Sequence, residues 1–408
     1  MRSEWKEHPL GEITELIIDY RGKTPQKLGG DWSDHGYRAL SAKNIKTGKI
    51  VQPDTIRYVD ETLYHKWMKD EIKRGDILIT SEAPFGQIYF WNSDEKIVLS
   101  QRLFGVRIQK DYDPRFIYYY MTTPEFQGEL SGRATGTTVI GLRQPELLKC
   151  VVRCPNVLTQ HKISSVLSAL DEKIEFNEKL NDNLQQQAQA IYQSLFVSFD
   201  GIPTNQLIDS ELGLMPVGWT VKSLSEVTTS IRTKVQDNDY KVLSAINTGQ
   251  LQLSEEHFNK QVFSKNISNY IVVEPFDFAY NPARINIGSI GMNTLGLTGC
   301  VSPVYVVIRT EPGYHHFFDF FVKTKRFSEE VKTRASGSVR QSLNYVDFGQ
   351  IKVAYPPIDA VERFNREYTV RLKIMEQLKT ENEKLVSIRD SLLPKLMSGE
   401  IDVSDVKL

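Results

Sequence analysis

The sequence predicts an α+β fold in which one unit, a globular part followed by a long helix, occurs twice. Three observations predict it. A repeat with a period of about 200 residues runs through the chain. The first part of each repeat has short β-branched and aromatic runs separated by Gly, Pro and Asn, as strands do. The end of each repeat is almost free of Gly and Pro and rich in helix formers, so we expect two long helices that pair with each other.

The repeat consists of matching phrases that follow one another in the same order. Trp5–Thr14 matches Trp219–Thr228 at an offset of 214, and from Leu142 onward the offset settles at 201. No single match is specific, but chance does not readily produce their shared order. Further pairs are Leu40-Ser41-Ala42 with Leu243-Ser244-Ala245, Ala134–Thr138 with Ala335–Ser338, Leu142 with Leu343, and Pro155 with Pro356.

The two helical patterns divide the chain into four segments. We expect globular parts in 1–157 and 199–357, the second preceded by a linker, and helices in 158–198 and 358–408. A chain of 408 residues that is 40% hydrophobic can build two cores. The formal net charge of -1 excludes a uniformly basic surface but leaves room for local basic patches.

Apolar residues recur with heptad spacing along both helices, and pairing along this seam buries both stripes at once. Polar Asn177, Asn181 and Asn382 interrupt the seam, and such residues fix the register of a coiled coil at a cost in stability. Arg371 and Arg389 also break it, so the second helix should use another face as well. A helix of roughly 35 residues spans about 50 Å. Two DNA half-sites one helical turn apart lie about 34 Å from centre to centre, so helices of this length could hold two DNA-binding domains on successive half-sites. The predicted seam residues are Ile163, Leu167, Leu170, Ile174, Leu184, Ala188, Ile191 and Leu195 in the first helix, and Phe364, Tyr368, Met375, Leu378, Leu385, Leu392 and Leu396 in the second.

Basic residues gather in stretches that also carry Gly, Ser, Thr, Asn or Gln. In 21–49, 131–153 and 323–340, Lys and Arg outnumber Asp and Glu. That mixture suits phosphate neutralisation together with hydrogen bonds to base edges. The predicted DNA contacts are Arg21, Lys23, Ser41, Lys43, Asn44, Lys46, Arg133, Thr135, Thr137, Thr138 and Arg143 in the first half, and Arg232, Lys234, Arg284, Arg334, Ser336, Ser338, Arg340 and Gln341 in the second.

Three other functions remain open from the residues alone. A nuclease could use Asp54 with Glu71-Ile72-Lys73, although such an acidic-x-Lys outline is common by chance. An amino-methyltransferase could use Tyr280-Asn281-Pro282, but the glycine-rich cofactor loop after a strand is missing. A coiled-coil adaptor without DNA binding would have no need for divergent basic globular parts.

Cysteine and histidine usage predicts no metal site and a reducing compartment. Three cysteines are too few for a disulfide scaffold, and we expect Cys150 and Cys154 to be small apolar residues on a buried strand. His315-His316 lacks a third ligand. No stretch approaches the ~20 apolar residues of a membrane span, so we expect a cytoplasmic protein without a membrane association.

Three longer phrases resemble the specificity subunits of type I restriction-modification enzymes, and the resemblance covers essentially the whole chain. They are Asp209-Ser-Glu-Leu-Gly-Leu-Met-Pro-Val-Gly-Trp219, Ser391-Leu-Leu-Pro-Lys-Leu-Met-Ser-Gly-Glu-Ile401, and Gln160-His-Lys-Ile163 leading into Leu170-Asp-Glu-Lys-Ile174. The resemblance implies that each globular part is a target recognition domain for one half of a split DNA sequence. It also implies that the helices form an antiparallel coiled coil with pseudo-twofold symmetry, which sets the spacing between the halves.

The resemblance further implies the partners. Two copies of the methyltransferase subunit would dock on the helices, and restriction subunits could join. S-adenosylmethionine, ATP and Mg²⁺ would act on those partners, with no cofactor and no catalytic residue in this subunit. The second half departs from the first at Tyr355-Pro356-Pro357 and in its arginine-interrupted seam, which bears on whether the two methyltransferase copies dock equally.

Overall fold

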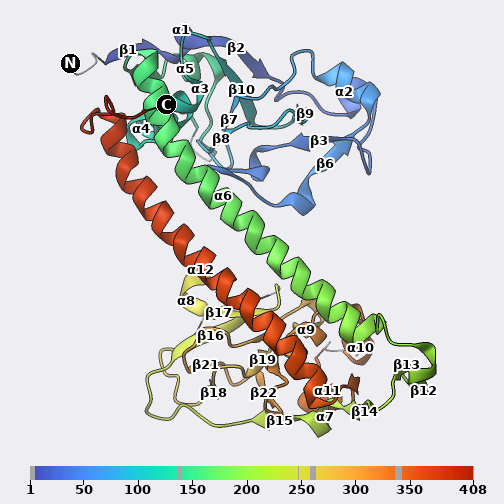
Figure 1. Ribbon diagram of the computed structural model, residues 1–408. Coiled ribbons are helices and arrows are strands. Elements are labelled where there is room, and N and C mark those ends of the chain that lie inside the picture. Colours follow the sequence, from blue (N-terminus) through green and yellow to red (C-terminus); the bar gives the residue numbers. More distant parts are fainter. Residues whose placement is uncertain (1–4, 137–138, 247, 258–262, 336–341, 408) are drawn as a thin grey trace. The chain divides into compact units, whose positions relative to one another are not determined.

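The computed structural model describes residues 5–136, 139–246, 248–257, 263–335 and 342–407 (Figure 1). The chain divides into two compact units, each of which takes part of both long helices. Unit 1 comprises 1–178 and 379–408, and unit 2 comprises 179–378. Unit 1 is therefore built from both ends of the chain, and unit 2 from its middle.

Unit 1 is organised around an antiparallel four-stranded sheet of order β2-β10-β7-β8. Beside it lies a three-stranded sheet of order β6-β3-β9, in which β3 and β9 run parallel. The strands are β1 Lys6–Pro9, β2 Thr14–Asp19, β3 Tyr37–Leu40, β4 Ile45–Lys46, β5 Lys49–Ile50, β6 Arg57–Val59, β7 Ile77–Thr80, β8 Ile88–Phe90, β9 Ile97–Leu99, β10 Leu103–Ile108 and β11 Val151–Cys154. The short helices are α1 Leu10–Ile13, α2 Glu61–Trp67, α3 Pro114–Met121, α4 Pro124–Arg133 and α5 Gln144–Leu148.

Unit 2 repeats this plan with an antiparallel sheet of order β15-β22-β19-β20. A second sheet of order β17-β16-β21-β18 again contains one parallel pair, β16 with β21. The strands are β12 Leu207–Ser210, β13 Gly213–Pro216, β14 Thr220–Ser223, β15 Thr228–Ile231, β16 Lys241–Ile246, β17 Gln250–Leu253, β18 Ile271–Val273, β19 Phe278–Tyr280, β20 Ile290–Met292, β21 Gly299–Val301, β22 Val306–Thr310 and β23 Lys352–Tyr355. The short helices are α7 Leu224–Val227, α8 Ser254–His257, α9 His315–Phe321, α10 Lys325–Arg334 and α11 Tyr345–Gly349.

The predicted internal repeat is confirmed by contacts that recur at matching positions. In unit 1 a buried ion pair joins Asp76 to Arg107 of β10, with 2.8 Å between Oδ2 and Nη2. In unit 2 Asp277 joins Arg309 of β22 at the same Oδ2–Nη2 distance. The side chains of Thr123 and Thr324 cap the N-termini of α4 and α10. Such buried and capping contacts set the common frame of both units.

Two long helices, α6 and α12, pair antiparallel, as the resemblance implied. α6 runs over Val157–Gln193 and ends in a π-helical turn, and α12 runs over Ile358–Met397. Within unit 1 the first half of α6 contacts the second half of α12, where Arg389 Nη1 lies 2.8 Å from Asp171 Oδ1. Within unit 2 the second half of α6 contacts the first half of α12, where the rings of Tyr192 and Phe364 lie 5.7 Å apart. Arg389, which interrupts the apolar heptad pattern of the second helix, thus forms an ion pair between the two helices.

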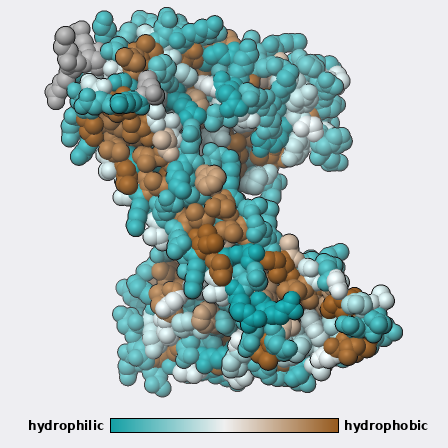
Figure 2. Space-filling model, viewed as in Figure 1, coloured by the Kyte–Doolittle hydropathy of each residue, from teal (hydrophilic) through white to brown (hydrophobic). Residues whose placement is uncertain are grey.

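The seam is more aromatic in unit 2 than the heptad pattern suggested. Tyr192 and Phe196 of the first helix pack with Phe364 and Tyr368 in the core of unit 2. Tyr192 and Phe196 did not lie on the predicted seam. On the outer side of the helices, apolar side chains reach the surface in a space-filling view, and Phe176 in unit 1 is 60% exposed (Figure 2). Of the predicted seam, Ile163, Leu167, Ile174, Leu184, Ala188, Phe364, Tyr368 and Leu396 are buried, and Leu170, Asn181, Ile191, Leu195, Met375, Leu378, Asn382, Leu385 and Leu392 are half-buried.

Candidate nucleic-acid interface

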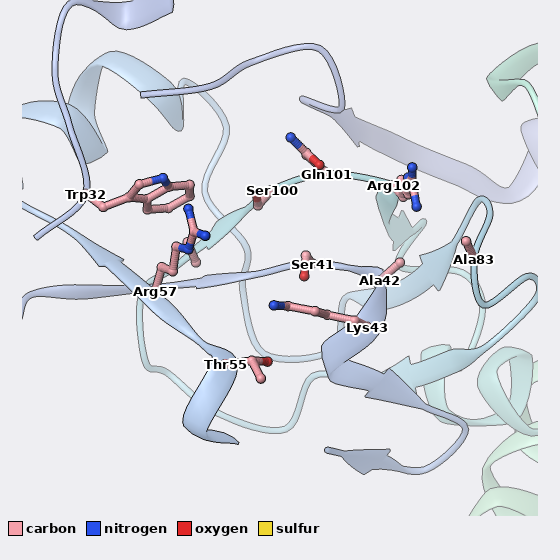
Figure 3. A pocket seen from close by; sticks show the side chains of 11 residues that line it. Trp32, Ser41, Ala42, Lys43, Thr55, Arg57, Ala83, Ser100, Gln101 and Arg102 are labelled. Carbon is pink, nitrogen blue, oxygen red and sulfur yellow. The ribbon is translucent and has the colours of Figure 1, made fainter. Parts of the chain in front are cut away.

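Three loops of unit 1 that are far apart in the sequence meet around one hollow. The turn 100–102, which joins β9 to β10, is tied to the loop after β3 by the Ala42 N–H, which donates to Gln101 O at 3.1 Å. It is tied to the loop after β7 by the Ser81 N–H, which donates to Arg102 O at 2.9 Å. These bonds place the loops around a cavity of about 340 Å³ (Figure 3). The sheets thus hold these polar loops together at one edge of the unit, which we call its loop edge.

The hollow is cationic with an aromatic side. Lys43 is exposed on one wall and Arg102 lies at the end of the opposite turn (Figure 3). The Arg57 guanidinium lies over the Trp32 ring, 5.1 Å from its centre. Cations beside a flat aromatic ring and hydroxyl groups suit a phosphate backbone and base edges together.

The loop after α4 packs beside the same hollow. Leu142 donates its N–H to Ser81 O at 3.0 Å, and Thr135 and Gly141 close the loop by a pair of backbone hydrogen bonds of 2.9 Å. Arg143 follows at the N-terminus of α5, exposed, and its side chain has no hydrogen bond or ion pair to the described residues. Thr135 is exposed as well, and the predicted contacts Thr137 and Thr138 lie outside the described residues. The structure therefore brings Arg143 and Lys43, which are 100 positions apart, into one neighbourhood of loops.

Several predicted contacts of unit 1 instead hold the loops together. The Arg21 guanidinium makes two 2.8 Å hydrogen bonds with Asp19 and a third, of 3.1 Å, with Leu142 O. Lys23 donates to Trp67 O at 2.6 Å, and burial lowers its pKa. Each of these cations already has partners within the protein, so we exclude them from the proposed DNA contacts.

The side chains of Asn44 and Arg133 also have partners within the protein. Asn44 is 1% exposed, and its side chain joins Ser41 to Thr55, so it shapes the loop and does not reach its surface. Arg133 pairs with Glu129 one turn earlier on α4 at 3.1 Å. Ser41 caps the short turn at 42–44 and also lines the hollow, and Lys46 is exposed on β4. Ser41, Lys43, Lys46, Thr135 and Arg143 therefore remain as candidates.

Unit 2 repeats the arrangement with different side chains. Leu343 donates its N–H to Pro282 O at 3.0 Å, as Leu142 does to Ser81. Arg284, in this loop after β19, and Arg232, after β15, are exposed, and their side chains have no hydrogen bond or ion pair within the described part of the chain. Lys234 donates to Asn269 Oδ1 at 3.1 Å.

The last basic stretch of unit 2 is only partly described. Arg334 pairs with Glu330 at 3.1 Å, just as Arg133 pairs with Glu129. Ser336, Ser338, Arg340 and Gln341 lie outside the described residues. The candidate contacts that the structure leaves available in unit 2 are therefore Arg232 and Arg284.

Reasoning from basic clusters missed four residues that line the hollow of unit 1. Trp32, Arg57, Gln101 and Arg102 come from three separate segments and reach one place only through the sheet order. A signal existed for two of them. The polar pair Gln101-Arg102 separates two apolar runs, Ile97–Leu99 and Leu103–Val106, as a turn between strands would.

Known proteins are similar in sequence to this chain over most of its length. The sequence profile of the type I restriction modification DNA specificity domain matches residues 2–186. The specificity subunit of the type I restriction enzyme HindI from Haemophilus influenzae is 23% identical, over 98% of this chain and 100% of that protein. The MjaIX specificity subunit of Methanocaldococcus jannaschii is 22% identical, over 82% of this chain and 79% of that protein.

A solved structure has a fold similar to that of this chain. The S subunit of a type I restriction-modification system from M. genitalium superposes with a TM-score of 0.57, 15% identity, and coverage of 97% of this chain and 96% of that one. The chain is thus similar to type I DNA specificity subunits over nearly its whole length. It shares with the M. genitalium S subunit the fold described above.

The catalytic and metal patterns considered from sequence have structural explanations in this chain. Glu71 pairs with Lys96 at 2.9 Å, and the Asn281 side chain accepts from the Ala283 N–H in a turn. His315 and His316 pack beside Phe276, and burial lowers the pKa of His316 to about 4. Cys150, Cys154 and Cys300 are buried as free thiols. Within the described residues no cluster of His, Cys, Asp and Glu could hold a metal, and no helix there is apolar and long enough to cross a bilayer.

Proposed function

We propose that this chain is the non-catalytic specificity subunit of a type I restriction-modification complex and reads a split double-stranded DNA sequence. Residues 1–157 and 199–357 would be the recognition domains, each reading one half-site. The helices in 158–198 and 358–408 would set the spacing between them. We place the complex in the cytoplasm, where its DNA lies.

The observation that carries the proposal is a shared frame with unlike loops. The ion pair of a buried aspartate with an arginine, the capping threonines and the order of the main sheet recur in both units. At the loop edge, however, unit 1 offers Lys43 and Arg143 and unit 2 offers Arg232 and Arg284. Two readers of different sequences need one frame and different contact residues, because base edges carry distinct donor and acceptor patterns.

The helices support docking of partner subunits. Each unit exposes apolar side chains on its helical part, Phe176 and Ile388 in unit 1 and Val370 and Ile374 in unit 2. Contiguous exposed apolar residues mark protein interfaces, and Val370 and Ile374 lie one turn apart on the same side of α12. We assign these positions to two copies of the methyltransferase subunit, which would carry S-adenosylmethionine. Restriction subunits, which would use ATP and Mg²⁺, would join that complex.

The proposal is tested by mapping methylated adenines in a host that expresses the methyltransferase subunit with or without this chain. We expect a split motif with a fixed gap only when both are present. Methylation or cleavage by this purified chain alone, supplied with DNA, Mg²⁺ and S-adenosylmethionine, would instead indicate a self-contained enzyme. A stable complex that methylates no defined motif would overturn the assignment of sequence recognition.

A further inference from the structure

The turn 100–102 presents two polar side chains in a fixed position at the loop edge of unit 1. Three backbone hydrogen bonds hold it, two of them those of Ala42 and Ser81, and the third from Ser100 N–H to Leu40 O at 2.8 Å. The turn is therefore as fixed as the strands β9 and β10 that it joins. Side chains on such a turn keep a constant position relative to the sheet.

Arg102 adopts a backbone conformation that most residues avoid. Its φ of 65° lies in the left-handed region, which disfavours side chains with a Cβ. Ala83, on the neighbouring loop of the same hollow, has a φ of 39°. Glycine would adopt both conformations without strain, so an arginine with this φ points to a use for its side chain.

The side chains of this turn keep hydrogen-bonding groups without a partner among the described residues, even though Arg102 pairs with Glu82. The Arg102 Nε lies 3.1 Å from Glu82 Oε1, which orients the guanidinium, while 48% of the side chain is exposed. No acceptor for the two Nη groups occurs among the described residues, nor any partner for the amide of exposed Gln101. The two side chains leave the turn in different directions, above the wall that carries Lys43 (Figure 3).

Unit 2 has an apolar turn at the equivalent place. Gly105 pairs with Leu78 in β7, and Val307 pairs with the corresponding Ala279 in β19, so β10 and β22 align at these residues. Arg102 lies three positions before Gly105 and Val304 three positions before Val307, so Gln101-Arg102 of unit 1 corresponds to Pro303-Val304 of unit 2. Val304 is 64% exposed and has no side-chain hydrogen-bonding group.

We propose that Gln101-Arg102 is a specificity-determining element that reads purine edges in the half-site of unit 1, with Arg102 on a guanine. Arginine binds guanine O6 and N7 through two hydrogen bonds, and glutamine binds adenine N6 and N7 in the same way. Pro303-Val304 can make only apolar contact, for which the thymine methyl group is the partner. The inference rests on the proposed function, since it names how one half-site is read.

The test compares methylation maps of Arg102→Gly and of the wild type, each expressed with the methyltransferase subunit. Glycine accommodates the positive φ, so the variant should fold and melt like the wild type. One guanine position in one half-site should lose its preference on the order of 10- to 100-fold, with the other half-site unchanged. Lys110→Ala, at the opposite end of β10, is the control and should leave the motif intact.

Two results would overturn the inference. An unchanged motif would show that Arg102 reads no base. Weaker methylation at all sequences, with the motif preserved, would show that it contacts only phosphates. A wild-type chain without any split motif would instead overturn the proposed function itself, so the two failures are distinguishable.

Discussion

The two units have the same frame but differ in the groups they present at their loop edge. In both, an arginine of the central strand pairs with a buried aspartate, and a threonine caps the helix before the variable loop. At the turn before that strand, unit 1 carries Gln101-Arg102 and unit 2 carries Pro303-Val304. Residues buried in the frame therefore preserve the fold, while the exposed turn residues differ between the two units.

The shared ion pair differs in its surroundings, and this difference can be tested. Arg107 is 17% exposed and Arg309 is 44% exposed, while both aspartates are 1% exposed. Arg309 also has a second partner, Glu274, at 2.6 Å. The frame of unit 1 should therefore depend more strongly on its aspartate than that of unit 2.

We expect Asp76→Ala to have the largest effect, a loss of about 3–5 kcal/mol in the free energy of unfolding, because it leaves Arg107 partly buried without its carboxylate. Asp277→Ala should cost only about 1.5–3 kcal/mol, because Arg309 keeps Glu274 and more solvent. Hydrogen-exchange mass spectrometry measures the loss of protection in each unit separately.

Asp94→Ala provides the matched control, because it removes the carboxylate of an exposed pair with Arg74 and should leave protection unchanged. Equal losses from Asp76→Ala and Asp277→Ala would contradict the difference in burial. Loss of protection in the unit that was not altered would show that the two units do not fold independently.

The two asparagines of the α6 seam form a second pair for comparison. In unit 1, Asn177 is fully buried and its Nδ2 donates to Glu381 Oε2 at 2.7 Å and Asn382 Oδ1 at 2.8 Å. The buried Oδ1 atoms of Asn177 and Asn181 both lack a hydrogen-bond partner among the described residues, and in unit 2 the Nδ2 of Asn181 has no partner there to compare with those of Asn177. The offset of 201 relates Asn181 to Asn382 and Asn177 to Leu378, so the polar pair has no equivalent in unit 2.

Leucine at these two positions should change stability in opposite directions. Asn177→Leu should lower the free energy of unfolding by about 1–3 kcal/mol, because Asn382 and Glu381 lose their donor. Asn181→Leu should raise it by up to about 1 kcal/mol, because an unsatisfied polar atom gives way to an apolar contact. Urea unfolding monitored by circular dichroism distinguishes the two, and destabilisation by both variants would refute the asymmetry of the seam.

The sequence predicted the repeat, the helices and the sheet-rich parts because periodic patterns and turn residues express local preferences. It could not separate Arg143, which stays exposed, from Arg21 and Lys23, whose partners Asp19 and Trp67 O become available only in the folded unit. Arg102 was missed because its significance lies in a backbone angle and in Glu82 on another loop. Tyr192 was missed because the heptad drifts where α6 meets the core of unit 2.

The central claim, that each unit reads its own half of a split site, is tested most directly by hydroxyl-radical footprinting of the methyltransferase complex on its target DNA. The wild type should protect two separated patches. Arg143→Ala should weaken protection of one patch by several-fold, and Arg284→Ala should weaken the other by a similar amount, since each removes an exposed cation of one unit. A single continuous patch, or loss of both patches from either substitution, would contradict the account.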